Sequence, residues 1–404
     1  MALIVQKFGG SSVADTEKIM NVARRIIDRY DKGDQVVVVV SAQGDTTDRL
    51  TEKAFKIHPN PPKREMDMLL STGEQISIAL LAMAIQRLEH KSVSLTGGQV
   101  GIKTTNQYSS ARIENICCDR LKSELDAGNI VIVAGFQGMD DYSNITTLGR
   151  GGSDTTAVAL AAALEADVCE IYTDVDGVYT ADPRIVPDAR KLDTISHDEM
   201  LEMASLGARV LHNRAVELAK KYNVNLVVRS SLNNNSGTMV KEVSNMEKMV
   251  VKGVAHDYDT AQINVMGVKD EPGMAYRLFR LLADANINVD IIVQGEVKDK
   301  KRDISFTVAQ HNLEETVAII ESNKEELGIK EFTYSSDVAK VSVIGAGMAE
   351  NAGIAALMFE TLAQEGINII MITTSEIKIS CLIKPNEVEK AVRAIHDKFC
   401  LGQE

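Results

Sequence analysis

The chain has 404 residues, of which 45% are hydrophobic and 25% charged, a composition typical of a globular protein with two or three domains. Its formal net charge of -13 argues against a nucleic-acid partner, because no domain-wide basic surface is available to neutralise phosphates. No apolar stretch approaches the roughly 20 residues that span a bilayer, and the N-terminus lacks a signal-peptide pattern, so we expect no membrane association.

Strand and helix patterns alternate over the first part of the chain. Apolar runs at 3–5, 36–40 and 130–134 are typical of parallel strands covered on both faces. Apolar residues between 19 and 30 recur at helical spacing, and further helices are predicted over about 65–88 and 155–164. The alternation predicts an α/β domain, an αβα sandwich with a mainly parallel sheet, over residues 1–240.

Two glycine-rich turns stand out in this domain. In the first, Gly9-Gly10 follows a strand and Lys7; in the second, residues 149–152 lead into an alanine-rich helix and include Arg150. Paired glycines let the backbone approach a bulky anion, and N–H groups at a helix start point toward it. We therefore expect phosphoryl transfer, which depends mainly on charge neutralisation and positioning.

The last third of the chain contains an internal repeat with an offset of 80 residues. Identical pairs include Gly273/Gly353, Ile287/Ile367 and Asn288/Asn368. Each copy is too long for a solenoid unit and predicts a small α+β domain. A duplicated domain after a catalytic one suggests regulation, with a purely dimerising role as the alternative.

Five cysteines at 117, 118, 169, 381 and 400 show no CxxC or other metal-site spacing. They favour reduced thiols in a cytoplasmic protein. No HExxH motif or paired Cys/His cluster is present either, so a built-in metal site is not expected.

Taken together, these motifs resemble the aspartate kinases of the amino-acid kinase superfamily, over the whole chain. The resemblance rests on KFGGSS at 7–12, SAQGDTTD at 41–48, STGEQ at 71–75, GFQG at 135–138, TTLGRGGSDTTA at 146–157, YTDVDGVYTADPR at 172–184, LGARVLH at 206–212 and TSEIKIS at 374–380. It implies an amino-acid-kinase fold followed by two ACT-like domains, at 263–337 and 338–404. Residues 241–262 would form a linker and one strand of the second ACT unit.

The implied activity is ATP-dependent phosphorylation of the side-chain carboxylate of L-aspartate to 4-phospho-L-aspartate, the first step toward lysine, threonine and methionine. Mg²⁺ would be carried by ATP. The resemblance implies catalytic roles for Lys7 and Asp154. It places ATP at Lys7, Phe8, Gly9, Gly10, Ser11, Ser41, Thr173, Asp174, Tyr179, Arg184, Arg209 and Val210. It places aspartate at Thr47, Glu74, Arg150, Gly151, Gly152 and Ser153, with Glu74 on the ammonium and Arg150 on the α-carboxylate.

Other interpretations of single residues remain open. Glu74 could be a solvated surface charge, Asp154 a helix N-cap, and Ser41 a turn cap. Residues 173–184 could form an ordinary Asp-Gly hairpin. The chain also departs from the family pattern at Arg209, Asn213, Gln43 and Gly98.

The resemblance further implies feedback inhibition by lysine, threonine or both together, bound between ACT units of paired chains. The expected effector residues are Asp270, Asn288, Val289, Gln294, Asn368, Ile369, Thr374 and Ser375. A homodimer or tetramer is expected, with a separate regulatory subunit if translation also starts at Met246 or Met249. The alternatives are a catalytically silent amino-acid sensor and a superfamily kinase acting on another amino acid.

Overall fold

The computed structural model describes residues 1–206, 210–242, 250–297, 301–348 and 351–403. These residues form two compact units, the first made of Met1–Tyr179 and Lys191–Met246, the second of Thr180–Arg190 and Glu247–Glu404. The short segment Thr180–Arg190 therefore lies within the sequence of the first unit but belongs structurally to the second. The domain boundaries drawn from the sequence remain a prediction.

The first unit is built on an eight-stranded sheet with the order β10-β12-β11-β9-β1-β2-β6-β3, in which every described pairing is parallel except β11 with β12. A smaller sheet has the order β5-β4-β7-β8. The strands are β1 (Leu3–Phe8), β2 (Gln35–Val40), β3 (Ser92–Leu95), β4 (Ile102–Thr104), β5 (Ile113–Ile116), β6 (Ile130–Ala134), β7 (Gln137–Met139), β8 (Ile145–Thr147), β9 (Val168–Thr173), β10 (Thr194–Ile195), β11 (Leu226–Ser230) and β12 (Thr238–Val240).

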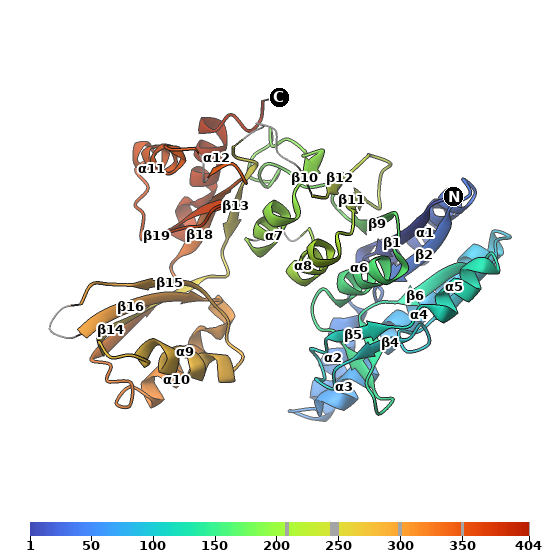
Figure 1. Ribbon diagram of the computed structural model, residues 1–404, viewed down its shortest axis with the longest axis horizontal. Helices are drawn as coiled ribbons and strands as arrows, with labels where there is room; N and C mark the ends of the chain where they lie inside the picture. Colours follow the sequence, from blue (N-terminus) through green and yellow to red (C-terminus); the bar gives the residue numbers. More distant parts are fainter. Residues whose placement is uncertain (207–209, 243–249, 298–300, 349–350, 404) are drawn as a thin grey trace. The chain divides into compact units, whose positions relative to one another are not determined.

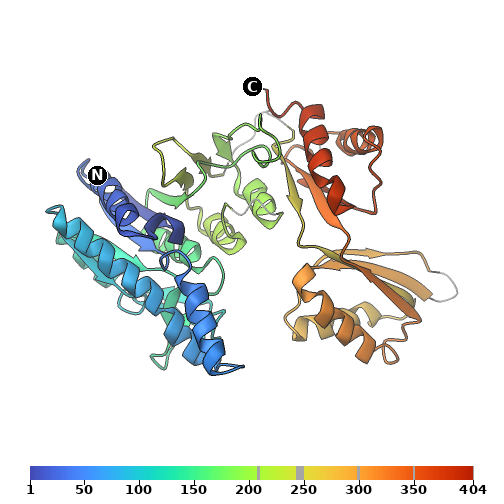
Figure 2. The same cartoon turned by 180° about the vertical axis from the view of Figure 1, so that it is seen from behind.

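Helices cover both faces of the large sheet, as the continuous apolar strands require. The helices of this unit are α1 (Thr16–Tyr30), α2 (Thr46–Ile57), α3 (Lys63–Leu70), α4 (Thr72–Arg87), α5 (Asp119–Asp126), α6 (Gly152–Leu164), α7 (His197–Ser205) and α8 (Asn213–Tyr222). Helix α6 lies over β1 on the face seen in Figure 1, and α1 and α4 lie against each other on the face seen in Figure 2. The predicted αβα architecture is confirmed.

The side-chain alternation of β1 separates the core from the reactive face. Phe8 is buried with Val36, Val38 and Val40 in the cluster beneath α1 and α4. Because successive side chains of a strand point to opposite faces, Lys7 points to the other side, where α6 begins. The strand that builds the core thus also aims a lysine at a helix N-terminus.

One helical stretch among the described residues, Lys63–Arg87, is long and apolar enough by length and composition to cross a membrane, although half of its most apolar window is buried. The buried residues Ile78, Leu81 and Ile85 belong to the core beneath the large sheet. The stretch is interrupted at Ser71, which separates α3 from α4. The core explains only part of its composition, because Ile76, Leu80 and Met83 on the same helix are exposed.

The second unit contains two four-stranded antiparallel sheets, with the orders β15-β16-β14-β17 and β13-β18-β20-β19 (Figure 1). The strands are β13 (Gly253–Asp257), β14 (Ala261–Lys269), β15 (Val289–Gln294), β16 (Lys301–Val308), β17 (Glu331–Ser335), β18 (Ala339–Ile344), β19 (Met371–Thr374) and β20 (Lys378–Ile383). The helices are α9 (Met274–Asp284), α10 (Leu313–Ser322), α11 (Ile354–Gln364) and α12 (Val388–Lys398).

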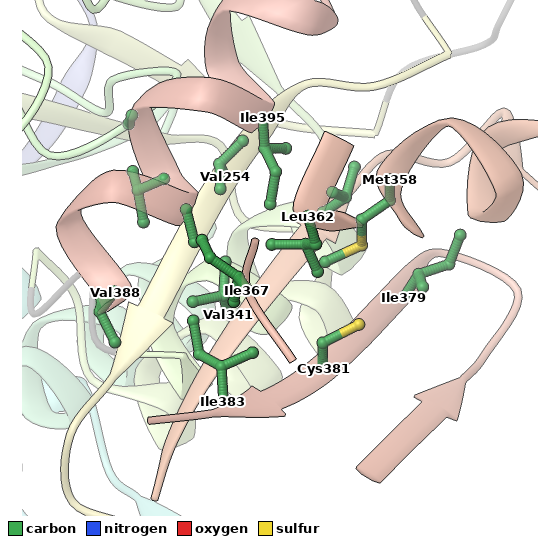
Figure 3. Packing of buried hydrophobic residues seen from close by; sticks show 14 of the residues in the cluster. Val254, Val341, Met358, Leu362, Ile367, Ile379, Cys381, Ile383, Val388 and Ile395 are labelled. Atoms are coloured by element: carbon green, nitrogen blue, oxygen red, sulfur yellow. The ribbon is translucent and has the colours of Figure 1, made fainter. Parts of the chain in front are cut away.

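The repeat seen in the sequence has the same backbone geometry in both copies. Gly273 and Gly353 have φ of 94° and 102° and precede α9 and α11. Asn286 and Gly366, also 80 residues apart, both have positive φ after these helices. The sheet containing β13 closes over a core that includes Val254, Val341, Leu362 and Ile395 (Figure 3). A strand preceding the first copy in the sequence therefore completes the second copy.

Candidate active site

The first glycine turn meets the end of β2 at Ala42. A Cβ placed on Gly10 would lie 2.6 Å from the Ala42 carbonyl oxygen, so only glycine permits this approach. The Gly44 N–H donates to the Gly10 carbonyl at 3.1 Å, and the Ser41 N–H donates to the Phe8 carbonyl at 3.1 Å. These contacts bring Phe8 to Ser11 beside Ser41, at the carboxyl ends of parallel strands, where ligands bind in open α/β sheets.

Glu74 reaches the same point from the first turn of α4. Its Oε1 accepts a hydrogen bond from the Ala42 N–H at 3.0 Å, while Oε2 is buried without a partner. Burial is the largest influence on this carboxyl and raises its pKa to about 7, although the backbone hydrogen bonds act in the opposite direction. At 3% exposure Glu74 is not a solvated surface charge. The free oxygen is an acceptor available to a cationic ligand.

The second glycine turn is joined to the first by an ion pair. Lys7 Nζ lies 2.6 Å from Asp154 Oδ1, with only 11% and 14% of the two side chains exposed. Asp154 lies in the first turn of α6 and caps no backbone N–H there, so its described partner is the lysine. Lys7 also lies 3.5 Å from where a Cβ on Gly9 would stand. An ammonium is thereby held beside both turns.

Gly151 allows α6 to begin in this position. Its φ is 66°, and an added Cβ would lie 2.1 Å from His212 Cγ. A cavity of about 370 Å³ adjoins this helix start and is lined by Gly151, Asp154, Ala204, Val210, Leu211, His212 and Asn213. Backbone N–H groups at a helix start and a nearby lysine suit an anionic group such as a phosphate.

The other residues expected to bind aspartate lie close to these elements. Ser153 is buried and packs close to Gly135. Arg150 is exposed and makes no ion pair with any residue that the structure describes. Thr47 lies in the first turn of α2, and its neighbour Thr46 approaches Gly73. Arg150 therefore has a free guanidinium at the edge of the second turn.

The remaining residues expected to bind ATP divide into three groups. Thr173 and Asp174 lie at the end of β9, and the Tyr179 hydroxyl donates to Asp176 at 2.6 Å, which raises the tyrosine pKa to about 12. Arg184 belongs to the second unit, where it binds Asp182 through bonds of 2.7 to 3.2 Å and is 89% exposed. Arg209 lies outside the described residues. The structure thus assembles only part of this set within one unit.

Three positioning residues were missed from the sequence. Asp67 is fully buried and accepts hydrogen bonds from Ser109 and from the N–H and hydroxyl of Thr147, both at 2.8 Å. Arg214 donates to the carbonyls of Leu148 at 2.8 Å and Ala111 at 2.9 Å. Both residues fix the strand and turn that lead to Arg150. No local sequence pattern marks them, because their partners are distant along the chain.

Ser231 is a third missed residue and links the first turn to β9. The Ser12 hydroxyl donates to Ser231 Oγ at 2.8 Å, and the Ser231 N–H donates to the Thr173 carbonyl at 2.8 Å.

Among the family departures, Gln43 donates to the Val13 carbonyl at 2.8 Å and Asn213 to Ser205 Oγ at 2.9 Å. A Cβ on Gly98 would lie 2.5 Å from Met139 Cε, so an aromatic side chain there would require Met139 to move.

A second pocket lies in the repeat region. Its volume is about 410 Å³, and its lining includes residues 268–275, Gln294, Arg302 and Ile304. Asp270 forms an ion pair with Arg302, and the Gln294 amide oxygen can accept from the same guanidinium at 3.0 and 3.2 Å. Asn288 and Val289 do not line this pocket, nor do Asn368, Ile369, Thr374 and Ser375. Arg302 is the residue that the sequence did not suggest.

Comparison with known proteins agrees with these features. Residues 2–230 match the amino acid kinase family, and residues 261–325 and 341–399 each match an ACT domain model. The chain is 53% identical to the aspartokinase of Mycolicibacterium smegmatis, over 100% of this chain and 97% of that protein. It is 52% identical to aspartokinase 2 of Bacillus subtilis, over 100% and 99%.

Solved structures give the same result. The chain resembles E. coli aspartokinase III in complex with aspartate and ADP in the R-state, with a TM-score of 0.81 and 25% identity, over 98% of this chain and 99% of that one. It also resembles aspartokinase III in complex with lysine and aspartate in the T-state, with a TM-score of 0.77 and 25% identity, over the same 98% and 99%.

Proposed function

Because the chain belongs to the aspartate kinases, amino acid kinases followed by two ACT domains, we propose that it transfers the γ-phosphoryl group of ATP to the side-chain carboxylate of L-aspartate, giving 4-phospho-L-aspartate. The observation that carries the proposal is the buried Oε2 of Glu74, an unpaired acceptor beside the first glycine turn. An α-ammonium would satisfy it. An N-acetylated amino acid would not, since acetylation removes that charge.

The proposed roles follow from charge and position. Glu74 holds the ammonium, and the unpaired guanidinium of Arg150 binds the α-carboxylate through two parallel N–H donors. The side-chain carboxylate then faces Lys7, whose ammonium offsets the charge that accumulates as carboxylate and γ-phosphoryl approach each other. Asp154 positions Lys7 through the 2.6 Å ion pair. Backbone N–H groups of Gly9, Gly10 and the α6 start bind the phosphates.

ATP and Mg²⁺ are proposed as the phosphoryl donor and its counterion. The residues fit an anionic nucleotide, because the glycine turns leave the backbone open and Lys7 lies close to both. Mg²⁺ supplies charge neutralisation on the phosphates when bound. We propose that this ion is brought by ATP rather than held by the protein alone.

The experiment that tests substrate choice measures ADP release with ATP and Mg²⁺. L-Aspartate, L-glutamate and N-acetyl-L-glutamate are compared at equal concentration, and we expect turnover with L-aspartate alone. Faster turnover with either other compound would move the proposal to another member of the superfamily. Absence of turnover with all three, from protein that still binds ATP, would favour an amino-acid sensor.

For the ACT domains we propose feedback inhibition by lysine, threonine or both together, with the Asp270–Arg302 pocket as the effector site. Asp270 suits an ammonium and Arg302 a carboxylate, so an amino acid would exchange this ion pair for its own two charges. The lysine-bound T-state of the related E. coli enzyme supports an amino-acid effector. Inhibition further requires the effector to prefer an inactive arrangement, because equal affinity for both states shifts nothing.

We also propose a homo-oligomer, with effectors bound between ACT units of paired chains. A separate regulatory subunit would start at Met246 or Met249, which lie outside the described residues. Native mass spectrometry of the complex from its own host tests this second point. A fragment beginning at one of these methionines would support the separate subunit, whereas a complex containing the full chain alone would show that the two methionines occur there by chance.

A further inference from the structure

Three potential metal ligands lie together in the second unit, which does not contain the two glycine turns. Asp188 belongs to the segment Thr180–Arg190, and His396 and Asp397 lie in the last turn of α12. One donor atom from each of the three side chains lies within 4.8 Å of the other two. We call these residues the Asp188–His396–Asp397 cluster.

The histidine of this cluster is buried, and only one of its two ring nitrogens has a hydrogen-bond partner. His396 has no exposed surface, and its Nε2 lies 3.0 Å from the Thr180 hydroxyl oxygen. Its Nδ1 has no hydrogen-bond partner, the distance to Asp397 Oδ1 being 3.9 Å. When Nε2–H donates to Thr180, Nδ1 carries a lone pair. A metal-bound histidine is usually oriented in this way, through its second nitrogen.

The two carboxylates are not neutralised by basic side chains. Neither Asp188 nor Asp397 forms an ion pair with a lysine or arginine that the structure describes. Two negative charges within 4.8 Å repel each other, and a cation between them would remove that cost. Among the residues that the structure describes, no lysine or arginine pairs with these carboxylates in the way that Lys7 pairs with Asp154.

The geometry leaves room for an ion after a small adjustment. Metal–ligand distances near 2.1 Å place neighbouring donor atoms about 3 to 4 Å apart. Asp397 has 73% of its side chain exposed and Asp188 is exposed too, so both carboxylates can move toward Nδ1. Gly402 closes one side, since a Cβ there would lie 2.9 Å from Asp188 Oδ2 and 3.4 Å from His396 Cε1.

We propose that the Asp188–His396–Asp397 cluster binds one divalent transition-metal ion, with Zn²⁺ as the best match. One imidazole nitrogen and two carboxylate oxygens are donors that Zn²⁺ takes readily, whereas Mg²⁺ prefers a shell of oxygens. The ion binds through Nδ1 and one oxygen of each carboxylate, with water completing its coordination. This site was not expected from the sequence, because Asp188 is distant along the chain from the other two ligands.

Binding would fasten Thr180–Arg190 to the end of α12. The segment is already attached there by the Thr180 contact to His396 and by Arg393 Nε, which donates to the Ile185 carbonyl at 2.8 Å. It continues from Tyr179, at the edge of the first unit. The ion would therefore stabilise the attachment of Thr180–Arg190 to α12 within the second unit.

The test is a calorimetric titration of Zn²⁺ into the metal-free full-length chain without nucleotide, in a background of millimolar Mg²⁺. We expect one equivalent to bind and the thermal midpoint to rise. Asp188→Asn and Asp397→Asn should each weaken binding about 100-fold or more, since changes even to outer-shell partners cost 10- to 100-fold. Both aspartates are exposed, so these variants keep the fold. Glu389→Gln, an exposed substitution on α12, is the matched control and should leave binding unchanged.

The exposed thiols of Cys117 and Cys400 are the alternative zinc ligands. A Cys117→Ser, Cys400→Ser double variant should retain the full equivalent of Zn²⁺. The Co²⁺ complex of the parent should show no sulfur-to-metal charge-transfer absorption. Loss of binding in the serine variant, equal binding in both asparagine variants, or no binding by the parent would each overturn the proposal.

Discussion

Replacing Glu74 by glutamine tests the aspartate clamp most sharply, because the pKa of this carboxyl lies near neutrality. With a pKa of about 7, the side chain is about one-tenth ionised at pH 6 and about nine-tenths ionised at pH 8. The ammonium of aspartate pairs with the ionised form. The affinity for aspartate should therefore rise about tenfold between pH 6 and pH 8, while neither α-group of the ligand titrates appreciably in that interval.

Glu74→Gln removes the titrating charge and keeps the shape. We expect it to bind aspartate about 30-fold more weakly at pH 8, corresponding to about 2 kcal/mol for a buried charged pair, with little dependence on pH. ATP affinity should change little. Calorimetric titrations of aspartate at pH 6, 7 and 8 measure both effects. A parent affinity that is flat over this range, or a variant that retains the parent's slope, would refute the clamp.

The same pKa makes a separate prediction about stability. Burial raises the folded-state pKa of Glu74 above its ordinary value of 4.5, so the folded protein holds the proton more tightly than the unfolded chain does. The stabilising contribution of protonated Glu74 is complete below about pH 4.5 and is lost as pH rises through 7. The difference corresponds to about 3 kcal/mol. The thermal midpoint of Glu74→Gln should thus rise relative to the parent between pH 5 and pH 8, and a constant difference would contradict the assignment.

Three further predictions concern the rest of the site and the effector pocket. Lys7→Ala should lower kcat by about 10²- to 10³-fold while circular dichroism shows a retained fold, and a rate within a few-fold of the parent would exclude the role of Lys7. Arg150→Ala should weaken aspartate binding strongly and ATP binding little. Arg150→Lys should restore little of the aspartate affinity, because an ammonium lacks the planar fork of a guanidinium. Unchanged aspartate affinity in the alanine variant would remove Arg150 from the site. Asp270→Ala and Gln294→Ala should relieve inhibition by lysine, threonine or the pair without lowering the uninhibited rate. Asp284→Ala, an exposed control on α9, should remain inhibited as the parent is. If the parent keeps full activity with either amino acid and with both, the ACT pair would be a dimerisation device.

Much of the fold could be predicted because its signals are local. Apolar strands and helical periodicity each depend on neighbouring residues, and the 80-residue repeat is visible by comparing the sequence with itself. The helix predicted over 65–88 is instead divided at Ser71. The Ser71 carbonyl accepts a hydrogen bond from the Gln137 side chain at 2.9 Å, a contact that no local pattern reveals.

The same division applies to the candidate site. The glycines and Lys7 could be chosen because their residue types and spacing indicate phosphate binding, whereas Glu74 could be chosen only because STGEQ resembles an aspartate-kinase motif. Asp67, Arg214 and Ser231 could not, since each is a single polar residue whose partners are distant along the chain, from 42 positions for Asp67 and Ser109 to 219 positions for Ser231 and Ser12. Arg302 was missed for a similar reason, because its partner Asp270 lies on the loop between β14 and α9, 32 residues earlier.

The central claim is that the chain makes an acyl phosphate on the aspartate side chain. Hydroxylamine traps such a product directly. With ATP, Mg²⁺ and L-aspartate, we predict that aspartate β-hydroxamate accumulates in step with ADP, and that Lys7→Ala protein abolishes both. Release of ADP without hydroxamate, or hydroxamate formed equally from L-glutamate, would contradict the account.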